Sequence, residues 1–404
     1  MAYIIFVNPA ILHETGMPLA AVVAATCLCA AFGSILMGIF ARYPIALAPG
    51  MGLNAYFTYT VVKGMGVPWE TALGAVFLSG IAFLILTAAG VRQMIVSAIP
   101  SELYSAVAVG IGLFIALIGL RNAGIIVASK ETLVTMGNLR DGNTLLAIAG
   151  LLLIAALLAW EVRGAILLGI LGTTGLGIVF GLVRWQPQSY SFADITATAL
   201  HLDIRGALRY GLIEIVFVFL FVDLFDNIGT LVAVGKQAKL FDKANEIPRI
   251  NRILYSDAAA TVVGSLAGTS TVTSYIESAA GVVAGGRSGV TAIVTGFLFF
   301  VALFVAPVVG AIPGAATAPA LIVVGSLMIA HAAEIPWSNP VVSIPAFLTI
   351  VTIPLTFSIA NGLAFGFTAY VILKIVRGEF RSVSWLVYAL AALFIARFIY
   401  LGAG

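Results

Sequence analysis

The sequence predicts an all-α, polytopic membrane protein made of two halves that cross the bilayer in opposite orientations. Of the 404 residues, 61% are hydrophobic and only 9% are charged, whereas soluble domains contain about 25% charged residues. Apolar runs close to the roughly 20 residues that span a bilayer recur along the whole chain. We therefore expect about 13–15 transmembrane segments.

The first apolar stretch, at 1–12, is too short to span the hydrocarbon, and Pro9 within it would interrupt a helix. It is either a broken half-helix or, as we expect, a truncated first helix. Further spans in the first half are expected at 17–40, 45–63, 69–91, 101–120, 143–160 and 163–183.

A polar segment at 184–207 divides the chain into its two halves. An odd number of crossings in each half inserts the halves in opposite orientations. A last apolar run, at 383–401, is an additional helix that breaks the symmetry and has no assigned role. The other spans of the second half are expected at 208–234, 250–267, 270–285, 288–311, 314–333, 342–358 and 361–377.

The distribution of basic residues indicates the orientation. If the first segment starts inside, twelve of the 20 Lys and Arg residues fall in inside loops, seven in outside loops and one in the last segment. Membrane proteins carry an excess of basic residues on the cytoplasmic side, so this orientation is favoured. Weak internal matches, of 101–120 with 314–333 and of 49–57 with 268–276, indicate an inverted repeat.

Two of the expected spans are poor helices. The first part of the span at 45–63 contains Pro49, Gly50 and Gly52, which discourage a helix until about Leu53. The span at 270–285 is preceded and opened by residues rich in Gly, Ser and Thr. Irregular backbone at membrane depth is tolerated only where it lines a cavity or is buried in protein. Two such segments in matching positions predict a site at the bilayer midplane, with a positive helix end pointing at it from each side. The alternative is a pair of Gly-rich packing kinks.

Acidic residues lie in or beside these apolar segments, where a carboxylate costs roughly 2.5–3.5 kcal/mol on insertion-based scales. Asp223 and Asp226 are three residues apart, hence on one helical face, and Glu277 is expected about one turn into the half-helix of its segment. We predict that Asp226 and Glu277 line the site. The alternative is a buried acid satisfied by Ser, Thr or backbone groups, and for Asp223 both interpretations stay open. Asp257 is expected to cap a helix start or to form an internal pair.

The other broken segment carries side chains that would face the acids. Asn54, with Tyr56 and Phe57, follows the irregular start of 45–63, and Tyr275 and Phe225 are further stacking candidates. Amide and carboxylate groups can read the N–H and C=O edge of a planar heterocycle, while aromatic rings cover its face. These residue types therefore predict a binding site for a flat, polar-edged small molecule.

Four stretches carry a resemblance to a known family: YIIFVNPAIL, APGMGLNAYF, FVDLFDNIGTL and GTSTVTSYIESAAGVVAGGR. They resemble the AzgA-type purine permeases, within the nucleobase–cation symporter-2 group that includes the uracil permease, and they occur in the family's order across nearly the whole chain. The resemblance implies a uracil-permease-like fold of two inverted seven-segment repeats. It further implies a core domain at 1–92 and 208–311, and a gate domain at 101–183 and 314–404 that includes the last helix.

The resemblance also implies proton-coupled uptake of adenine, guanine or hypoxanthine, by a multi-pass protein of a bacterial-type inner (plasma) membrane. On the matching motifs, Asp226 and Glu277 take the positions of the substrate-binding acids, and one of them would carry the coupling proton. Asn54 matches the polar residue of the third segment, and Asp223 belongs to the same motif as Asp226. Tyr275 and Phe57 complete the predicted substrate site.

Other classes of function are less compatible with the residues. An anion transporter or channel on a related inverted-repeat plan would need a positive pocket, whereas the expected site carries acids. An intramembrane enzyme would need a nucleophile–base set or a metal cluster, and the sequence has no motif for either. We therefore expect a transporter without cofactor or metal. Its expected partners are a purine nucleobase, protons and the lipid bilayer, with no nucleic acid, and whether it forms a homodimer stays open.

Overall fold

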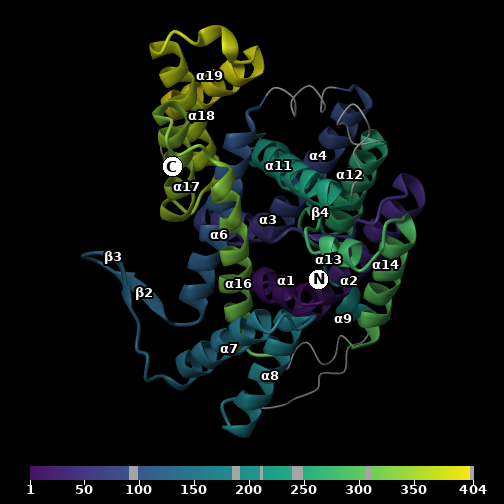
Figure 1. Cartoon of the computed structure of the whole chain (residues 1–404). Helices are drawn as coiled ribbons and strands as arrows, with labels where there is room; N and C mark the ends of the chain where they lie inside the picture. Colours follow the sequence, from purple (N-terminus) through teal and green to yellow (C-terminus); the bar gives the residue numbers. More distant parts are fainter. Residues whose placement is uncertain (91–98, 184–191, 210–212, 239–248, 306–311, 401–404) are drawn as a thin grey trace.

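The computed structural model describes residues 1–90, 99–183, 192–209, 213–238, 249–305 and 312–400 (Figure 1). The described chain is mainly helical, with two small two-stranded sheets. Six of its helices are long and apolar enough to cross a membrane, and further apolar helices are shorter. The first third of the predicted polar segment 184–207, at 184–191, lies outside the described residues.

The first half runs from the N-terminus to residue 183. Its two π-helical segments, η1 and η2, continue the helices that precede them. Its elements are α1 (Ile4–His13), α2 (Leu19–Leu36), η1 (Met37–Ala41), β1 (Leu47–Pro49), α3 (Met51–Ala55), η2 (Tyr56–Gly64), α4 (Trp69–Ala88), α6 (Ser101–Asn122), β2 (Ile126–Ser129), β3 (Leu133–Met136), α7 (Gly142–Ala159) and α8 (Ala165–Val179).

The second half contains the other short strand and the C-terminal helices. Its elements are α9 (Phe192–Thr196), α10 (Ile204–Arg209), α11 (Ile213–Ala238), α12 (Ile250–Ala267), β4 (Val272–Ser274), α13 (Ser278–Val283), α14 (Gly289–Ala302), η3 (Leu303–Val305), α16 (Gly314–Met328), η4 (Ile329–Glu334), α17 (Pro340–Leu355), α18 (Ile359–Val376), η5 (Phe380–Ser382) and α19 (Trp385–Tyr400).

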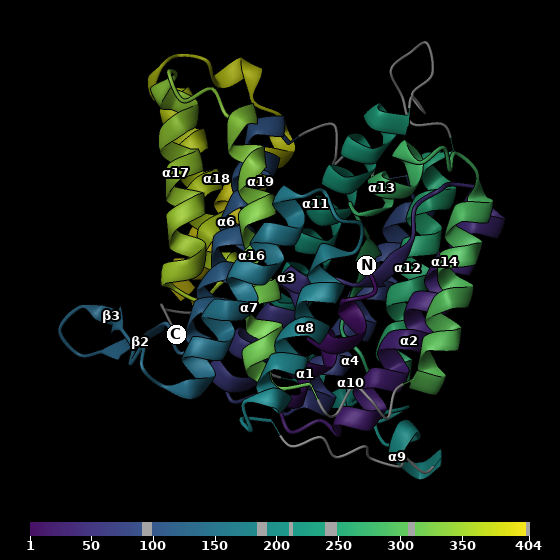
Figure 2. The ribbon, with the colours of Figure 1, turned by 60° about the horizontal axis from the view of Figure 1, so that its bottom comes forward.

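The helices pack in two groups, which Figures 1 and 2 show side by side. The first group contains α1–α4 and α9–α14, with η1, η2, β1 and β4; here α14 packs on α2, and α12 on both α2 and α4. The second group contains α6–α8 and α16–α19; here α16 and α17 pack on α6, and α18 on α17. The two groups meet where α1 contacts α16, and where α3 and α11 contact α6.

Small residues allow the close approach of α6 and α16, the two helices at the centre of the second group. A Cβ atom added to Gly325 would lie 2.4 Å from the carbonyl oxygen of Gly112 on α6. Only glycine leaves room for this backbone contact, and small residues of this kind are typical of helix packing in membranes. The paired helices derive from the matching stretches 101–120 and 314–333.

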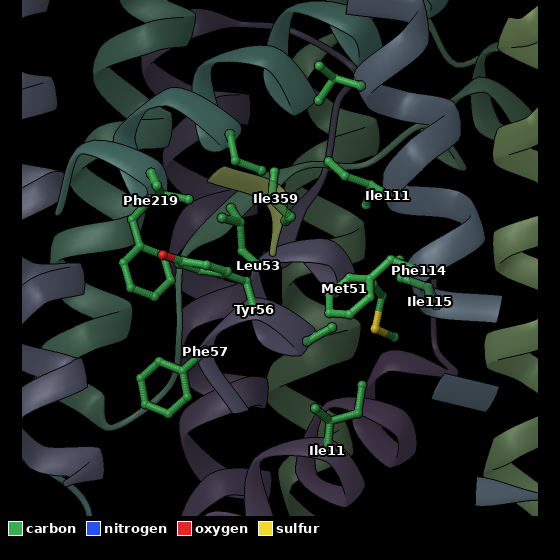
Figure 3. Close-up of a cluster of buried hydrophobic side chains, with 14 of the residues drawn as sticks. Ile11, Met51, Leu53, Tyr56, Phe57, Ile111, Phe114, Ile115, Phe219 and Ile359 are labelled. Carbon is green, nitrogen blue, oxygen red and sulfur yellow. The ribbon is translucent and has the colours of Figure 1, made fainter. Parts of the chain in front are cut away.

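Aromatic packing encloses the helical part of the broken segment α3–η2 (Figure 3). Tyr56 and Phe57 are fully buried, and both rings contact Phe219 of α11, at centroid distances of 5.2 and 6.4 Å. On the side of the second group, Phe114 of α6 meets Phe357, which precedes α18, at 5.6 Å. This dense packing fixes α3–η2 at the face of the first group that meets the second group.

Several predictions of local structure are wrong. Helix α1 continues through Pro9, because proline removes a single hydrogen bond from it and the buried Asn8 beside it is held by side chains of other elements. Asp257 lies in the middle of α12 and is fully buried, so it does not cap a helix start. The exposed hairpin β2–β3 was not predicted, because its strands are too short to stand out beside the long apolar runs.

Candidate substrate-binding site

The two broken segments cross each other as an antiparallel pair of short strands. Strand β1 pairs with β4, with Leu47 opposite Ser274 and Pro49 opposite Val272. The backbone pairing continues beyond the strands, since the Gly50 N–H donates to the Thr271 carbonyl at 2.9 Å and the Tyr275 N–H donates to the Ala46 carbonyl at 3.0 Å. The predicted breaks in 45–63 and 270–285 are thus confirmed, and they meet in space.

In each strand, one residue has both its backbone N–H and its carbonyl hydrogen-bonded to a hydroxyl of the preceding helix. Ser34 of α2 accepts from the Leu47 N–H at 2.9 Å and donates to the Leu47 carbonyl at 3.0 Å. Thr261 of α12 makes the same two bonds to Val272, at 3.2 and 3.0 Å. Backbone polar groups at membrane depth need such partners, and the same solution in both halves reflects the inverted repeat.

A helix begins directly after each strand. On one side α3 begins at Met51, and on the other α13 begins at Ser278, whose hydroxyl accepts from the Ala46 N–H at 3.0 Å. Glu277 immediately precedes α13. The prediction that Glu277 lies one turn into its half-helix is therefore wrong, because residues 275–277 form the connection from β4 rather than helix.

The structure brings Asp226 and Glu277 together at the strand crossing. Asp226, on α11, accepts a hydrogen bond from the Thr273 hydroxyl of β4 at 3.2 Å. Glu277 accepts one from the Tyr3 hydroxyl at 2.5 Å. The two carboxylates are close enough to interact electrostatically with each other and with the ring hydroxyls of Tyr3 and Tyr275. Both acids are partly exposed, so they remain accessible.

Glycine lets the other broken segment approach this pair. A Cβ atom added to Gly50 would lie 2.9 Å from the Thr273 methyl carbon and 3.6 Å from the Asp226 carboxylate. The backbone before α3 therefore lies against the acid of α11. Any larger residue at Gly50 would occupy the space between the two halves.

Buried polar groups at the crossing have hydrogen-bonding capacity that is not used. The Ser270 hydroxyl donates to the Asn54 side-chain oxygen, and the Tyr275 hydroxyl donates to the Pro49 carbonyl at 2.5 Å. Within the described residues, the Asn54 amide nitrogen and the hydroxyls of Thr271 and Ser274 have no hydrogen-bond partner. Because buried polar groups are normally satisfied, these atoms indicate a place where a polar ligand or water completes the bonding.

The remaining predicted residues differ in their surroundings. Asp223 is buried, 2% exposed, one turn before Asp226 on α11. Phe57 packs its ring on Phe219 within the hydrophobic cluster of Figure 3, and no described contact brings it to either carboxylate. The side chain of Phe225 lies outside the described residues.

Sequence reasoning missed the contribution of α1 and of Tyr3, the residue directly before it. Tyr3 reaches Glu277, and Asn8 donates to the hydroxyls of Thr26 at 2.7 Å and Thr269 at 3.1 Å, which ties α1 to α2 and to the chain that leads into β4. The available signal was an asparagine and a tyrosine in an otherwise apolar stretch. A tyrosine near the end of an apolar helix is so common that it did not single out Tyr3.

Comparison with known proteins decides the family. The profile of the Permease family (Xan_ur_permease) matches residues 1–400. This chain belongs to that family. The predicted family resemblance is thereby confirmed, and this permease is a multi-pass integral protein of the plasma membrane, of a transporter family rather than an enzyme family.

Curated relatives of the permease match it over nearly their whole length. A putative permease of Methanocaldococcus jannaschii is 54% identical over 402 residues, covering 99% of this chain and 92% of the relative. The adenine permease AdeP of Escherichia coli is 45% identical over 403 residues (100% and 91%). The guanine/hypoxanthine permease PbuG of Bacillus subtilis is 45% identical over 413 residues (99% and 94%).

Solved structures share the fold. The transmembrane domain of the cyanobacterial bicarbonate transporter BicA aligns with a TM-score of 0.68 at 15% identity, covering 89% of this chain and 95% of that one. The murine anion transporter Slc26a9 in its inward-facing state aligns with a TM-score of 0.67 at 10% identity (92% and 66%). The predicted fold of two inverted seven-segment repeats is confirmed by this likeness, which at such identity concerns the fold alone.

Proposed function

We propose that this permease imports purine nucleobases, namely hypoxanthine, guanine or adenine, by proton symport through alternating access. The observation that carries the proposal is the crossing of β1 and β4, which sets Asp226 and Glu277 beside unsatisfied polar groups between the two repeats. The names of the adenine and guanine/hypoxanthine permeases among the relatives support the substrate class.

The site offers the groups that a purine edge requires. Glu277 accepts hydrogen bonds from ring N–H and exocyclic amine groups, and Asp226 completes the pocket directly or through water. The free amide N–H₂ of Asn54 donates to a ring nitrogen or a carbonyl. A few convergent polar groups in an apolar surrounding are typical of small-molecule sites.

One of the two acids takes the coupling proton. A charged carboxylate at membrane depth is costly, and two carboxylates that repel each other raise that cost. Protonation of one of them removes the repulsion, while a base that donates N–H groups to the other compensates its charge. Loading of the proton and loading of the base therefore favour each other.

The two helix groups provide the moving parts. The first group, as a core domain, carries Asp226, Glu277 and both strands, while the second group, as a gate domain, holds none of these. The contacts between the groups run mainly through α1, α3 and α11 on one side and α6, α16 and α18 on the other. Sliding of the first group along these helices would expose the site to each side of the membrane in turn.

The test is uptake of radiolabelled hypoxanthine, guanine, adenine and uracil into proteoliposomes, with and without an inward proton gradient. We expect purine uptake that rises with the gradient, and competition among the bases then ranks them. Purine uptake of the same rate with and without the gradient would refute proton symport and would still support the substrate class. Uptake of bicarbonate or chloride instead of any base would favour the anion transporter, which the pair of carboxylates disfavours.

A further inference from the structure

We propose that Glu14, Tyr59, Lys63 and Asn122 form a latch that holds α1 and η2 against α6 and opens once in each transport cycle. This inference rests on the proposed alternating access, and it assigns positioning residues that lie away from the strand crossing. The predicted orientation places the ends of α1, η2 and α6 on the outer side of the membrane.

The cluster is organised around the Glu14 carboxylate, directly after α1. One carboxylate oxygen accepts from the Tyr59 hydroxyl at 2.7 Å and from the Asn122 amide at 3.4 Å, and the other pairs with the Lys63 ammonium. The Asn122 amide also donates to the Tyr59 hydroxyl at 3.1 Å. Lys63 lies 5.5 Å from the centre of the Tyr59 ring.

Only one member of the cluster belongs to the second helix group. Glu14, Tyr59 and Lys63 follow α1 or lie on η2, whereas Asn122 is the last residue of α6. When the first group moves, the ion pair and the bond from Tyr59 to Glu14 travel with it, and within the cluster only the two bonds of Asn122 have to break. Outside the cluster, a third hydrogen bond between the groups, from the Thr60 hydroxyl of η2 to the Phe357 carbonyl, has to break as well.

The latch is weak enough to open. The side chains of Glu14 and Lys63 are 32% and 40% exposed, so water can replace each broken hydrogen bond, and exposed ion pairs contribute little on their own. A cavity of about 290 Å³ lies beside it, between α1, α6 and α16. Its lining includes Ala10, Glu14 and Asn122, so separation of Asn122 from Glu14 would widen this cavity toward the outside.

One continuous element joins the latch to the strand crossing. Gly50 lies against Asp226, and the chain then runs without interruption through α3 into η2, which carries Tyr59 and Lys63. Segment η2 is π-helical over nine residues, a rare conformation that is frequent at functional sites. A shift of the backbone at Gly50 on loading would therefore be passed to the latch.

The experiment measures access to the cavity with a cysteine at Ala10, in a protein in which Cys27 and Cys29 are replaced by alanine. A membrane-impermeant maleimide is applied to intact cells and, separately, to inside-out vesicles. We expect Asn122→Ala and Tyr59→Phe to speed labelling from the outside by about tenfold, which corresponds to about 1.4 kcal/mol. Asn138→Ala is the matched control, because Asn138 lies in the outer loop that follows α6. Among the described residues, its side chain bonds only locally, to the Arg140 N–H.

Unchanged labelling in both variants, or a rise seen only from the cytoplasmic side, would overturn the latch. Tyr59→Phe keeps the ring and removes only the hydroxyl. If Asn122→Ala does not fold, Tyr59→Phe still tests the latch. The readout needs no substrate. If the variants label faster but the protein takes up no purine, the proposed substrate is refuted and the latch is still supported.

Discussion

At the scale of single residues, each acid at the crossing accepts a hydrogen bond from a hydroxyl that lies elsewhere in the chain: Glu277 from Tyr3, directly before α1, and Asp226 from Thr273 of β4. Hydrogen bonds to a charged acceptor are worth about 1.5–3 kcal/mol each. They offset part of the cost of keeping a carboxylate at membrane depth. They also orient the remaining lone pairs, which a ligand can then use.

Glu277→Gln should reduce purine uptake by at least about tenfold, because the amide turns one of the two acceptors into a donor facing the donors of Tyr3 and the base. The measurement is uptake into proteoliposomes at equal amounts of inserted protein. Glu131→Gln, in the exposed hairpin, is the matched control. Full uptake by Glu277→Gln would contradict the assigned role.

Tyr3→Phe should weaken binding of the base by about tenfold, since Glu277 loses the hydroxyl that orients it. Equilibrium binding of radiolabelled base to purified protein measures the effect. Tyr388→Phe also removes a phenol hydroxyl, one that donates to the Phe380 carbonyl far from the site, and should leave binding unchanged. Equal effects of the two variants would point to general destabilisation instead.

At the scale of elements, the sequence predicts the two interruptions well, because Pro, Gly, Ser and Thr are concentrated at 49–52 and 268–274. It does not predict that these stretches pair as strands, since the register depends on contacts between the two halves. The role of Tyr3 could not be predicted either, because it depends on a contact with Glu277, which lies 274 positions away in the sequence. Asp226 and Glu277 stand out in the sequence because acids are rare in apolar segments, and their role in binding stays a prediction. Phe57 resembles many packing residues and packs on Phe219.

Gly50→Ala should abolish or strongly reduce uptake while the protein still inserts. The backbone of Gly50 is extended (φ −75°, ψ 124°), which alanine adopts freely. The effect therefore comes from the added methyl group, which would lie against Thr273 and near Asp226, and overpacking of this kind costs about 1–3 kcal/mol. Gly175→Ala on α8, where a Cβ atom meets nothing within 4 Å, is the control. Uptake by Gly50→Ala at the level of that control would show that the close approach is dispensable.

At the scale of the whole molecule, the last helix, α19 of the second group, also packs against the first group. Phe394 of α19 is 1% exposed, and its ring lies 5.9 Å from Phe217 of α11 and 6.2 Å from Phe367 of α18. The repeat pattern marked this helix as extra and gave it no role. The structure places it against both helix groups, a contact that no local pattern encodes.

Phe394→Ala should lower the melting temperature of the detergent-solubilised protein, because truncation of a buried phenylalanine costs about 3–5 kcal/mol in soluble cores. Leu393→Ala serves as the control, since the neighbouring Leu393 is 50% exposed on the same helix and should change little. Equal melting temperatures would mean that α19 does not stabilise the two groups.

The pairing of β1 with β4 has a consequence for biosynthesis. The Ala46 N–H donates to the Ser278 hydroxyl, which lies 232 positions later in the sequence. At about 5–20 residues per second, the ribosome needs roughly 10–50 s to synthesise the chain between them. During that time the nascent first half carries backbone groups that cannot remain unpaired in hydrocarbon. We expect the translocon, or water retained beside it, to shelter this segment until the second half emerges, so that the protein completes its insertion late and as one unit.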